Sequence, residues 1–253
     1  MRGLAAHLKN AATLTAILAL SVGLLMLSNL VERNVPLWRP LAACLSGVAL
    51  SIPFFFLIVR FYKMRARSIV IPRANSRDVV WGFVLGLGVF AVASAVYYSA
   101  NPAKHILFHW PAASDILGQA LFQVRPALIE EIGFRLGLAG LATALYGRTA
   151  GWVAGSIPFG LLHLLNFATG EPIMWDYIIG TTAAGLFLTT VYFNFDLTGA
   201  IATHFTWNVF ASLWAESLTI PQEHLEGAPA TLVILIGASA LLWLRKLRHR
   251  QSV

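Results

Sequence analysis

Residues 11–31 read AATLTAILALSVGLLMLSNLV, a run without a single charged side chain. A helix that crosses a bilayer needs about 20 mostly apolar residues, so this run is long enough to span. A signal peptide also has an apolar run near the amino terminus, but no small-residue cleavage pattern follows this one and further apolar runs come after it. We therefore expect a retained membrane-spanning helix.

Further apolar runs along the chain predict an all-α, polytopic transmembrane bundle. Of its 253 residues, 58% are hydrophobic and only 11% are charged, whereas soluble domains are about 25% charged. No polar stretch is large enough for a soluble domain, so we expect residues 1–253 to form one membrane-embedded domain. About eight spanning helices are predicted, at 11–31, 41–59, 79–100, 116–146, 150–167, 177–195, 198–215 and 229–244.

The distribution of charge predicts how the bundle is oriented. Most of the 18 Lys and Arg residues lie before the first run, between residues 60 and 77, or after the last run. Basic residues accumulate on the cytoplasmic side of short loops, so we expect a multi-pass protein of the cell membrane with both termini cytoplasmic. The net charge of +7 is then explained by orientation and by contact with membrane lipids. No basic domain with interleaved aromatic residues is present, so nucleic acid is not an expected partner.

The run at 116–146 carries four charged residues in its middle: Arg125, Glu130, Glu131 and Arg135. Each costs about 2.5–3.5 kcal/mol to insert, so such residues normally face a polar interior and mark function. Glu131 and Arg135 are four residues apart and lie on one helical face as an ion pair. Glu130 points about 140° away from Arg135 around the helix. Its charge is therefore less neutralised, which suits it to act as a general base or acid. The alternative is that all four form a structural salt-bridge network.

Two later runs add histidines. Phe159 precedes His163 by one turn and is expected to pack on its imidazole, although a lone His in an apolar helix is more often a packing residue. His204 and Asn208 share a helical face and suit an oxyanion hole or, equally, an interhelical hydrogen-bonding pair. Asn166 either lines a cavity or caps a helix end. His105 and His109 in an outer loop are read as part of an interfacial helix.

A carboxylate, a histidine and a His/Asn donor pair are what peptide hydrolysis by an activated water requires. No Gly-x-Ser-x-Gly signature is present and the single cysteine, Cys44, has no nearby base, so a covalent nucleophile is the less favoured choice.

The three motifs also carry a family resemblance. Glu-Glu-x-x-x-Arg at 130–135, Phe-x-x-x-His at 159–163 and His-x-x-x-Asn at 204–208 resemble, in that order, the motifs of the CPBP (Abi) family of intramembrane proteases, which includes the CAAX prenyl endopeptidases and bacteriocin-processing relatives. The resemblance covers mainly residues 116–215, which we expect to be the catalytic helical core.

The resemblance implies a role for each motif residue. Glu130 and His163 would activate the water, His204 and Asn208 would form the oxyanion hole, and Glu131 with Arg135 would order the site. Glu130, His163 and His204 also make a candidate His₂Glu zinc set. We favour the scheme without a metal, because the glutamate and histidine suffice for it; zinc remains the alternative cofactor.

The leading hypothesis is therefore an intramembrane endopeptidase that cuts a membrane-associated peptide or protein. The alternatives are a non-catalytic immunity or scaffold protein and a proton-coupled transporter, although no paired halves with broken helices are evident. One difficulty concerns depth. At 1.5 Å per residue, His163 lies about 20 Å and His204 about 10 Å from the inner end of its predicted span, so the two meet only if helices tilt or boundaries shift.

Overall fold

The computed structural model describes residues 2–35, 38–65, 75–100, 111–168, 172–217, 235–240 and 242. All regular secondary structure among these residues is helical, which confirms the predicted all-α class. Apolar length explains why. The chain places long runs of hydrophobic residues between short polar connections, and a helix satisfies every backbone hydrogen bond within such a run.

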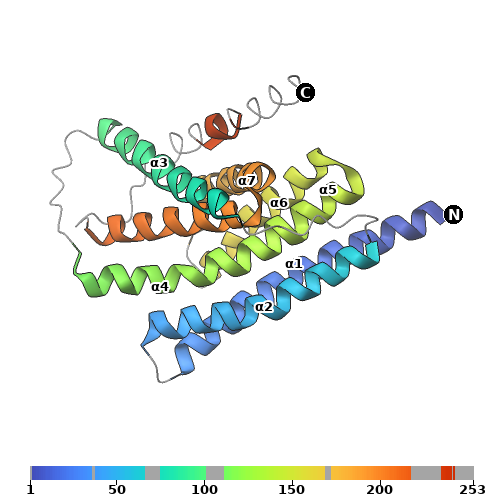
Figure 1. Cartoon of the computed structure of the whole chain (residues 1–253), viewed down its shortest axis with the longest axis horizontal. Helices are drawn as coiled ribbons and strands as arrows, with labels where there is room; N and C mark the ends of the chain where they lie inside the picture. The colour runs from blue at the N-terminus through green and yellow to red at the C-terminus, as the bar shows by residue number, and fades with distance from the viewer. Residues whose placement is uncertain are drawn as a thin grey trace.

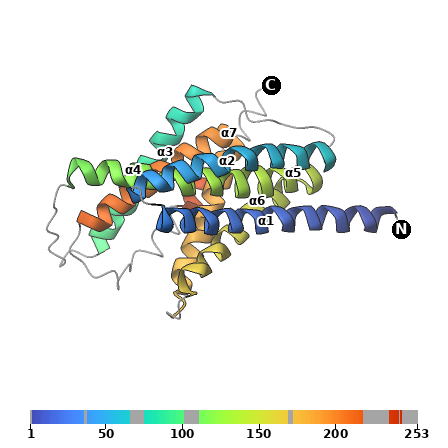
Figure 2. The ribbon, with the colours of Figure 1, turned by 90° about the horizontal axis from the view of Figure 1, so that it is seen from below.

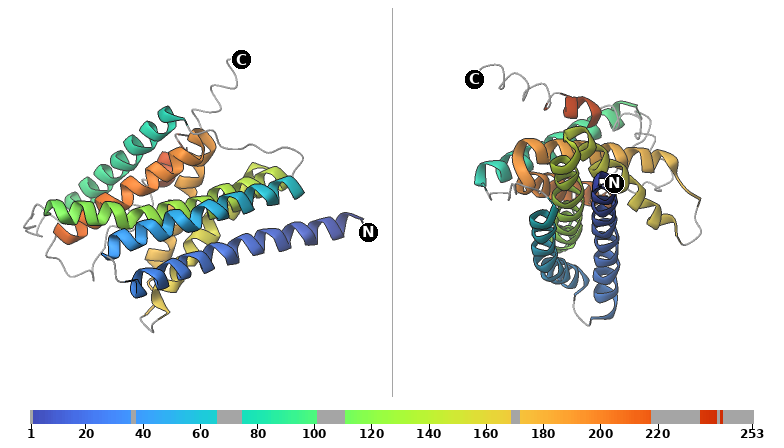
Figure 3. Two further views of the ribbon diagram at one scale, coloured as in Figure 1. Left: turned by 60° about the horizontal axis from the view of Figure 1, so that its bottom comes forward. Right: turned by 90° about the vertical axis from the view of Figure 1, so that its right-hand side faces the viewer.

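One group of long helices lies side by side. α1 (Arg2–Asn34) and α2 (Arg39–Arg65) run along the helix formed by α4 (Ala113–Glu130), which continues as η1 (Glu131–Gly140) and α5 (Leu141–Tyr146). Figure 3 shows these helices roughly parallel, with α2 between α1 and α4. η1 is a π-helix, a form that is rare and often found at functional sites.

A second group crosses the first. α3 (Ser76–Ala100) packs on α7 (Trp175–Ser217), as Figure 1 shows, and the Thr203 hydroxyl of α7 donates to the Gly82 carbonyl of α3 at 3.1 Å. α6 (Arg148–Leu162) and the short 3-10 helix η2 (His163–Phe167) precede α7. In Figure 2, α6 runs obliquely to α1 and α4. With this tilt, His163 and His204 meet although their predicted depths in the membrane differ. Both contact the ring of Phe159.

The predicted count of about eight spans is not confirmed. Five helices among the described residues are long and apolar enough to cross a membrane: Leu4–Asn34, Arg39–Arg65, Ser76–Ala95, Arg148–Phe167 and Trp175–Leu213. The predicted run at 116–146 is not among them, since its middle carries four charges. The predicted runs 177–195 and 198–215 are two halves of α7 that meet at a kink. The predicted run 229–244 lies largely outside the described residues, as do His105 and His109.

Two backbone positions set the path of the chain toward the site. Gly147 (φ 91°) joins α5 directly to α6, a conformation that glycine adopts without strain. Asp196 (φ 59°) sits at the kink of α7 and is the one described non-glycine residue with positive φ.

Close packing then brings α6 against η1. A Cβ added at Gly155 would lie 2.6 Å from the Thr189 hydroxyl and 2.8 Å from the Ala139 methyl group, so only glycine allows this approach. The packing places the Gly155 carbonyl within reach of Arg135.

Candidate functional site

The centre of the site is a buried ion pair on η1. Glu131 and Arg135 are both 0% exposed, and Arg135 Nε lies 3.1 Å from Glu131 Oε2. The predicted i, i+4 ion pair is therefore present. Arg135 also donates from Nη1 to the Gly155 carbonyl at 3.3 Å, and its guanidinium lies 4.3 Å from the centroid of the Phe159 ring. These contacts tie η1 to α6 and give the buried cation a cation–π partner.

Glu131 has a second partner that the sequence did not predict. Its other oxygen, Oε1, lies 2.8 Å from Nδ1 of His204 on α7. An ionised carboxylate only accepts hydrogen bonds, so Nδ1 of the imidazole is the donor. Glu131 therefore binds Arg135 with one oxygen and orients His204 with the other. The spacing along the helix predicted that His204 lies beside Asn208 but gave no sign of its contact with Glu131, because a contact across 73 residues of chain leaves no local pattern.

The remaining ring nitrogen of His204 lies beside Glu130. Nε2 is 3.9 Å from Glu130 Oε2, which is too long for a direct hydrogen bond. Both atoms thus remain available to a third group placed next to them. Glu130 forms no ion pair with Arg135, in line with the predicted division between the two glutamates. It is 9% exposed, whereas Glu131 is fully buried.

His163 is held in a similar way at the end of α6. Its Nδ1 lies 2.9 Å from the Phe159 carbonyl, an acceptor, so Nδ1 donates and Nε2 is left free. Its ring is 5.1 Å from the Phe159 ring, as predicted for packing one turn apart. The same Phe159 ring lies 6.0 Å from His204 and 5.4 Å, edge to face, from Phe134. The Phe159 ring thus contacts Arg135 and both histidines.

Asn208 follows His204 by one turn of α7 and is partly buried. It forms no hydrogen bond to any residue that the structure describes. Its carboxamide is therefore free to bind a ligand on the same helical face as His204.

Arg125 does not belong to this cluster. It pairs with Glu32 at the end of α1, and its guanidinium lies 4.7 Å from the Phe122 ring. The alternative of one network of four charges is therefore wrong for Arg125, because it lies almost three turns before Arg135 and faces a different neighbouring helix. Glu32 lies in the last turn of α1.

The structure shows polar contacts of Tyr177, Gln123 and Ser212 that the sequence did not predict. Asn166 donates to the Tyr177 hydroxyl at 3.2 Å, and the Tyr177 ring lies 5.7 Å from His163. Gln123 of α4 donates to the Ser212 hydroxyl of α7 at 3.0 Å. A tyrosine two residues after Trp175 is indistinguishable in sequence from an interfacial aromatic residue, so no local signal identified it.

Within the described part of the chain, no three His, Cys, Asp or Glu side chains are close enough to hold one ion. By residue type, the most suitable metal ligands are Glu130, His163 and His204. Both histidines donate a hydrogen bond from Nδ1, as metal-bound histidines commonly do through their second ring nitrogen.

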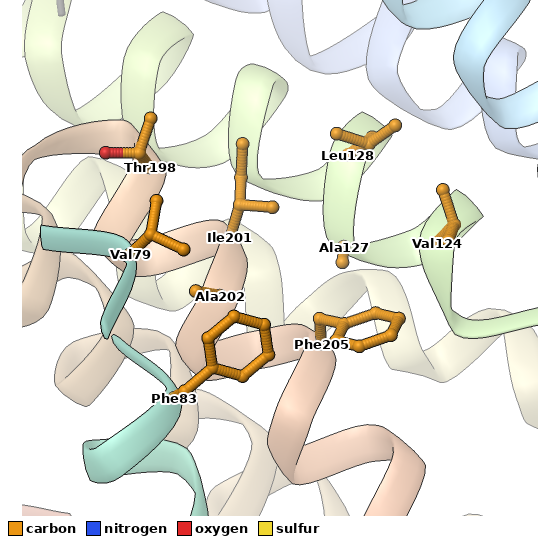
Figure 4. Close-up of a pocket in the computed structure, with 9 residues that line it drawn as sticks. All are labelled: Val79, Phe83, Val124, Ala127, Leu128, Thr198, Ile201, Ala202 and Phe205. Atoms are coloured by element: carbon orange, nitrogen blue, oxygen red, sulfur yellow. The ribbon is translucent and has the colours of Figure 1, made fainter. Parts of the chain in front are cut away.

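An apolar groove lies on the same helices as the charged cluster. Figure 4 shows its lining residues on α3, α4 and α7. Its volume is about 230 Å³. Its lining includes none of the candidate site residues, and Thr198 is its single polar side chain. The lining residues are Val79, Phe83, Val124, Ala127, Leu128, Thr198, Ile201, Ala202 and Phe205.

The region that contains the candidate site residues resembles a known protein family. Residues 112–210 match the family described as type II CAAX prenyl endopeptidase Rce1-like. This part of the chain is similar to the Rce1-like proteins. The Rce1-like region runs from the start of α4 to the last turns of α7, and all six candidate site residues lie inside it. No curated protein matched the chain. The five apolar helices indicate a membrane protein, and its region 112–210 is similar to CAAX-type proteases.

Proposed function

We propose that the chain is an intramembrane endopeptidase that hydrolyses a peptide bond with a water activated by Glu130 and His163. The observation that carries the proposal is the placement of Glu130 Oε2 beside Nε2 of His204, with Glu131 behind that histidine, inside the Rce1-like region. Such a carboxylate–histidine arrangement fixes both tautomer and orientation in hydrolases.

Glu130 is the general base of the proposed mechanism. It removes a proton from a water whose oxygen attacks the carbonyl carbon, while His163 orients that water through its free Nε2. When the C–N bond breaks, Glu130 returns the proton to the leaving nitrogen. A base of this kind typically contributes 10²–10⁴-fold to the rate.

His204 and Asn208 stabilise the oxyanion in this scheme. Donation from Nε2 of His204 requires a second proton on the ring, and the Glu131 carboxylate at 2.8 Å stabilises the resulting imidazolium. The Asn208 carboxamide supplies the other donor. Arg135 holds Glu131 in place through their ion pair.

The proposed reaction needs no metal. Zinc held by Glu130, His163 and His204 is the alternative, and it would activate the water by lowering its pKa. Metal analysis of the purified protein separates the two schemes. One tightly bound zinc per chain, with activity lost on chelation and restored by zinc, would replace our scheme with the zinc-dependent one.

The substrate we propose is a membrane-associated protein or peptide, with the enzyme in the cell membrane and both of its termini cytoplasmic. The family name describes CAAX prenyl endopeptidases, so a farnesylated peptide ending in a CAAX sequence is the first probe to use. Comparison of the peptides in cells that carry the wild type or Glu130→Gln would identify the natural substrate.

The decisive experiment measures cleavage of this probe by the full chain in lipid nanodiscs. We expect Glu130→Gln and His163→Ala to lower the rate by about 10²–10⁴-fold while the variants insert and fold normally. Asp176→Asn is the matched control, because it removes an exposed carboxylate at the start of α7 and should leave the rate unchanged. Normal cleavage by folded Glu130→Gln would refute the proposal.

A further inference from the structure

The end of α6 brings two polar side chains together beside His163. At His163 the helix tightens into the 3-10 helix η2, where residues three apart eclipse one another. Asn166 is three residues after His163 and thus lies on the same face. Its Nδ2 donates to the hydroxyl of Tyr177, in the first turn of α7, at 3.2 Å.

The ring of Tyr177 is held in place by contacts with two other rings. The ring lies edge-on to His163 at 5.7 Å and to Phe167 at 5.9 Å, so it packs directly beside the His163 imidazole. The hydroxyl accepts the Asn166 hydrogen bond, and no described residue accepts its own proton. That proton is available to a ligand.

Asn166 also has hydrogen-bonding groups that no described residue uses. It is exposed, and its single described hydrogen bond uses one of two Nδ2 hydrogens. The Oδ1 acceptor and the second hydrogen are free. Together, Asn166 and Tyr177 thus offer an acceptor and donors a few ångströms apart, which complements the N–H and C=O groups of an extended peptide.

The surroundings suit a peptide that is attached to a membrane. Asn166 and Tyr177 lie at the adjoining ends of two membrane-length helices, Arg148–Phe167 and Trp175–Leu213. The neighbouring side chains Leu165, Ile173, Met174 and Trp175 are apolar and 47–61% exposed. A tryptophan at such a boundary is typical of the membrane interface.

We propose that Asn166 and Tyr177 form a subsite that binds the main chain of an extended CAAX-type peptide next to the bond to be cleaved. Asn166 Oδ1 accepts a substrate N–H, and the Tyr177 hydroxyl donates to a substrate carbonyl. The inference rests on the proposed function, because it assumes that the bound peptide is the substrate. It adds two substrate-contacting residues that the three motifs do not contain.

Binding to an inactive enzyme tests the subsite without requiring cleavage. The full chain carrying Glu130→Gln, in lipid nanodiscs, is titrated with a fluorescent farnesylated CAAX peptide. We expect Tyr177→Phe, which retains the ring, and Asn166→Ala each to weaken binding about tenfold, as loss of one good hydrogen bond does. Tyr146→Phe is the matched control, since Tyr146 is an exposed tyrosine at the distant end of α5 that stacks on His7.

A panel of peptides with one ester in place of one amide locates the contact. An ester lacks the N–H, so the ester at the contacted position should weaken binding about tenfold when Asn166 is present and not at all in Asn166→Ala. The inference is overturned if no ester shows this dependence on Asn166. It is also overturned if the peptide does not bind the parent, or if Tyr177→Phe lowers only kcat of the active enzyme, which would make Tyr177 a positioning residue.

The two proposals fail in different ways. If the wild type cleaves the probe but Asn166→Ala and Tyr177→Phe bind it normally, the subsite is wrong and the protease assignment stands. If these variants lose binding but the wild type cleaves neither this probe nor any cellular peptide, the subsite stands as a binding site and the protease assignment is wrong.

Discussion

The charged cluster around Glu131 and the apolar groove of Figure 4 share two helical segments, α4–η1 and α7, yet their chemistry is opposite. In the cluster, Glu131 binds Arg135 through one oxygen and His204 through the other, so each contact depends on the orientation of both side chains. In the groove, the side chains touch through apolar surface, and the Thr198 hydroxyl has no hydrogen-bond partner among the described residues. The cluster should therefore tolerate almost no substitution, and the groove many.

The largest effect should come from Arg135→Met, which leaves the fully buried Glu131 without its cation. Removal of one partner of a buried ion pair costs about 3–5 kcal/mol, so we expect the variant to unfold in detergent at a much lower temperature than the wild type. The double variant Glu131→Gln/Arg135→Met carries no unpaired charge there and should recover most of the loss. Equal thermal stability of Arg135→Met and the wild type would show that the pair is not buried as described.

The double variant also tests the orientation of His204 apart from stability. A glutamine at position 131 can donate to Nδ1 and thereby favour the other tautomer of His204. We expect a folded protein whose kcat is lower by about 10³–10⁴-fold, the size of effect seen when a histidine loses its orienting carboxylate. Measurement of probe cleavage at matched folded protein decides this, and a near-normal kcat would remove Glu131 from the proposed mechanism.

A matched pair of phenylalanines compares the two regions directly. Phe159→Leu removes the ring that contacts Arg135 and both histidines, so we expect about a tenfold loss of kcat with a stability loss of about 1–2 kcal/mol. Phe205→Leu makes the same change in the groove, where the ring contacts Phe83, and should lower stability alone. Similar losses of kcat for both variants would show that the two regions are coupled.

The smallest effect should come from Thr198→Val in the groove. Replacement of a buried hydroxyl that has no partner by a methyl group should leave stability unchanged or raise it by up to about 1 kcal/mol, with kcat within about twofold. Thr203→Val is the comparison, since its hydroxyl donates to the Gly82 and Gly199 carbonyls and its loss should cost about 1 kcal/mol. Thermal unfolding of both variants measures the difference, and a larger loss for Thr198→Val would contradict it.

Sequence alone determined the helical class, the buried charges and the three motifs, because apolar run length and spacing within one helix are local properties. The Glu131–Arg135 pair followed from a spacing of four residues and is present. The packing of Phe159 on His163 followed in the same way.

The tertiary structure decided which helices meet, and at what height. Helix tilt, the π-helix after Glu130 and the 3-10 helix at His163 are not encoded in hydropathy, yet they bring His204 to Glu131 and Asn166 to Tyr177. They also leave Arg125 with Glu32 instead of with the site. Contacts between residues far apart in the chain depend on how whole helices pack, and a local pattern carries no record of that packing.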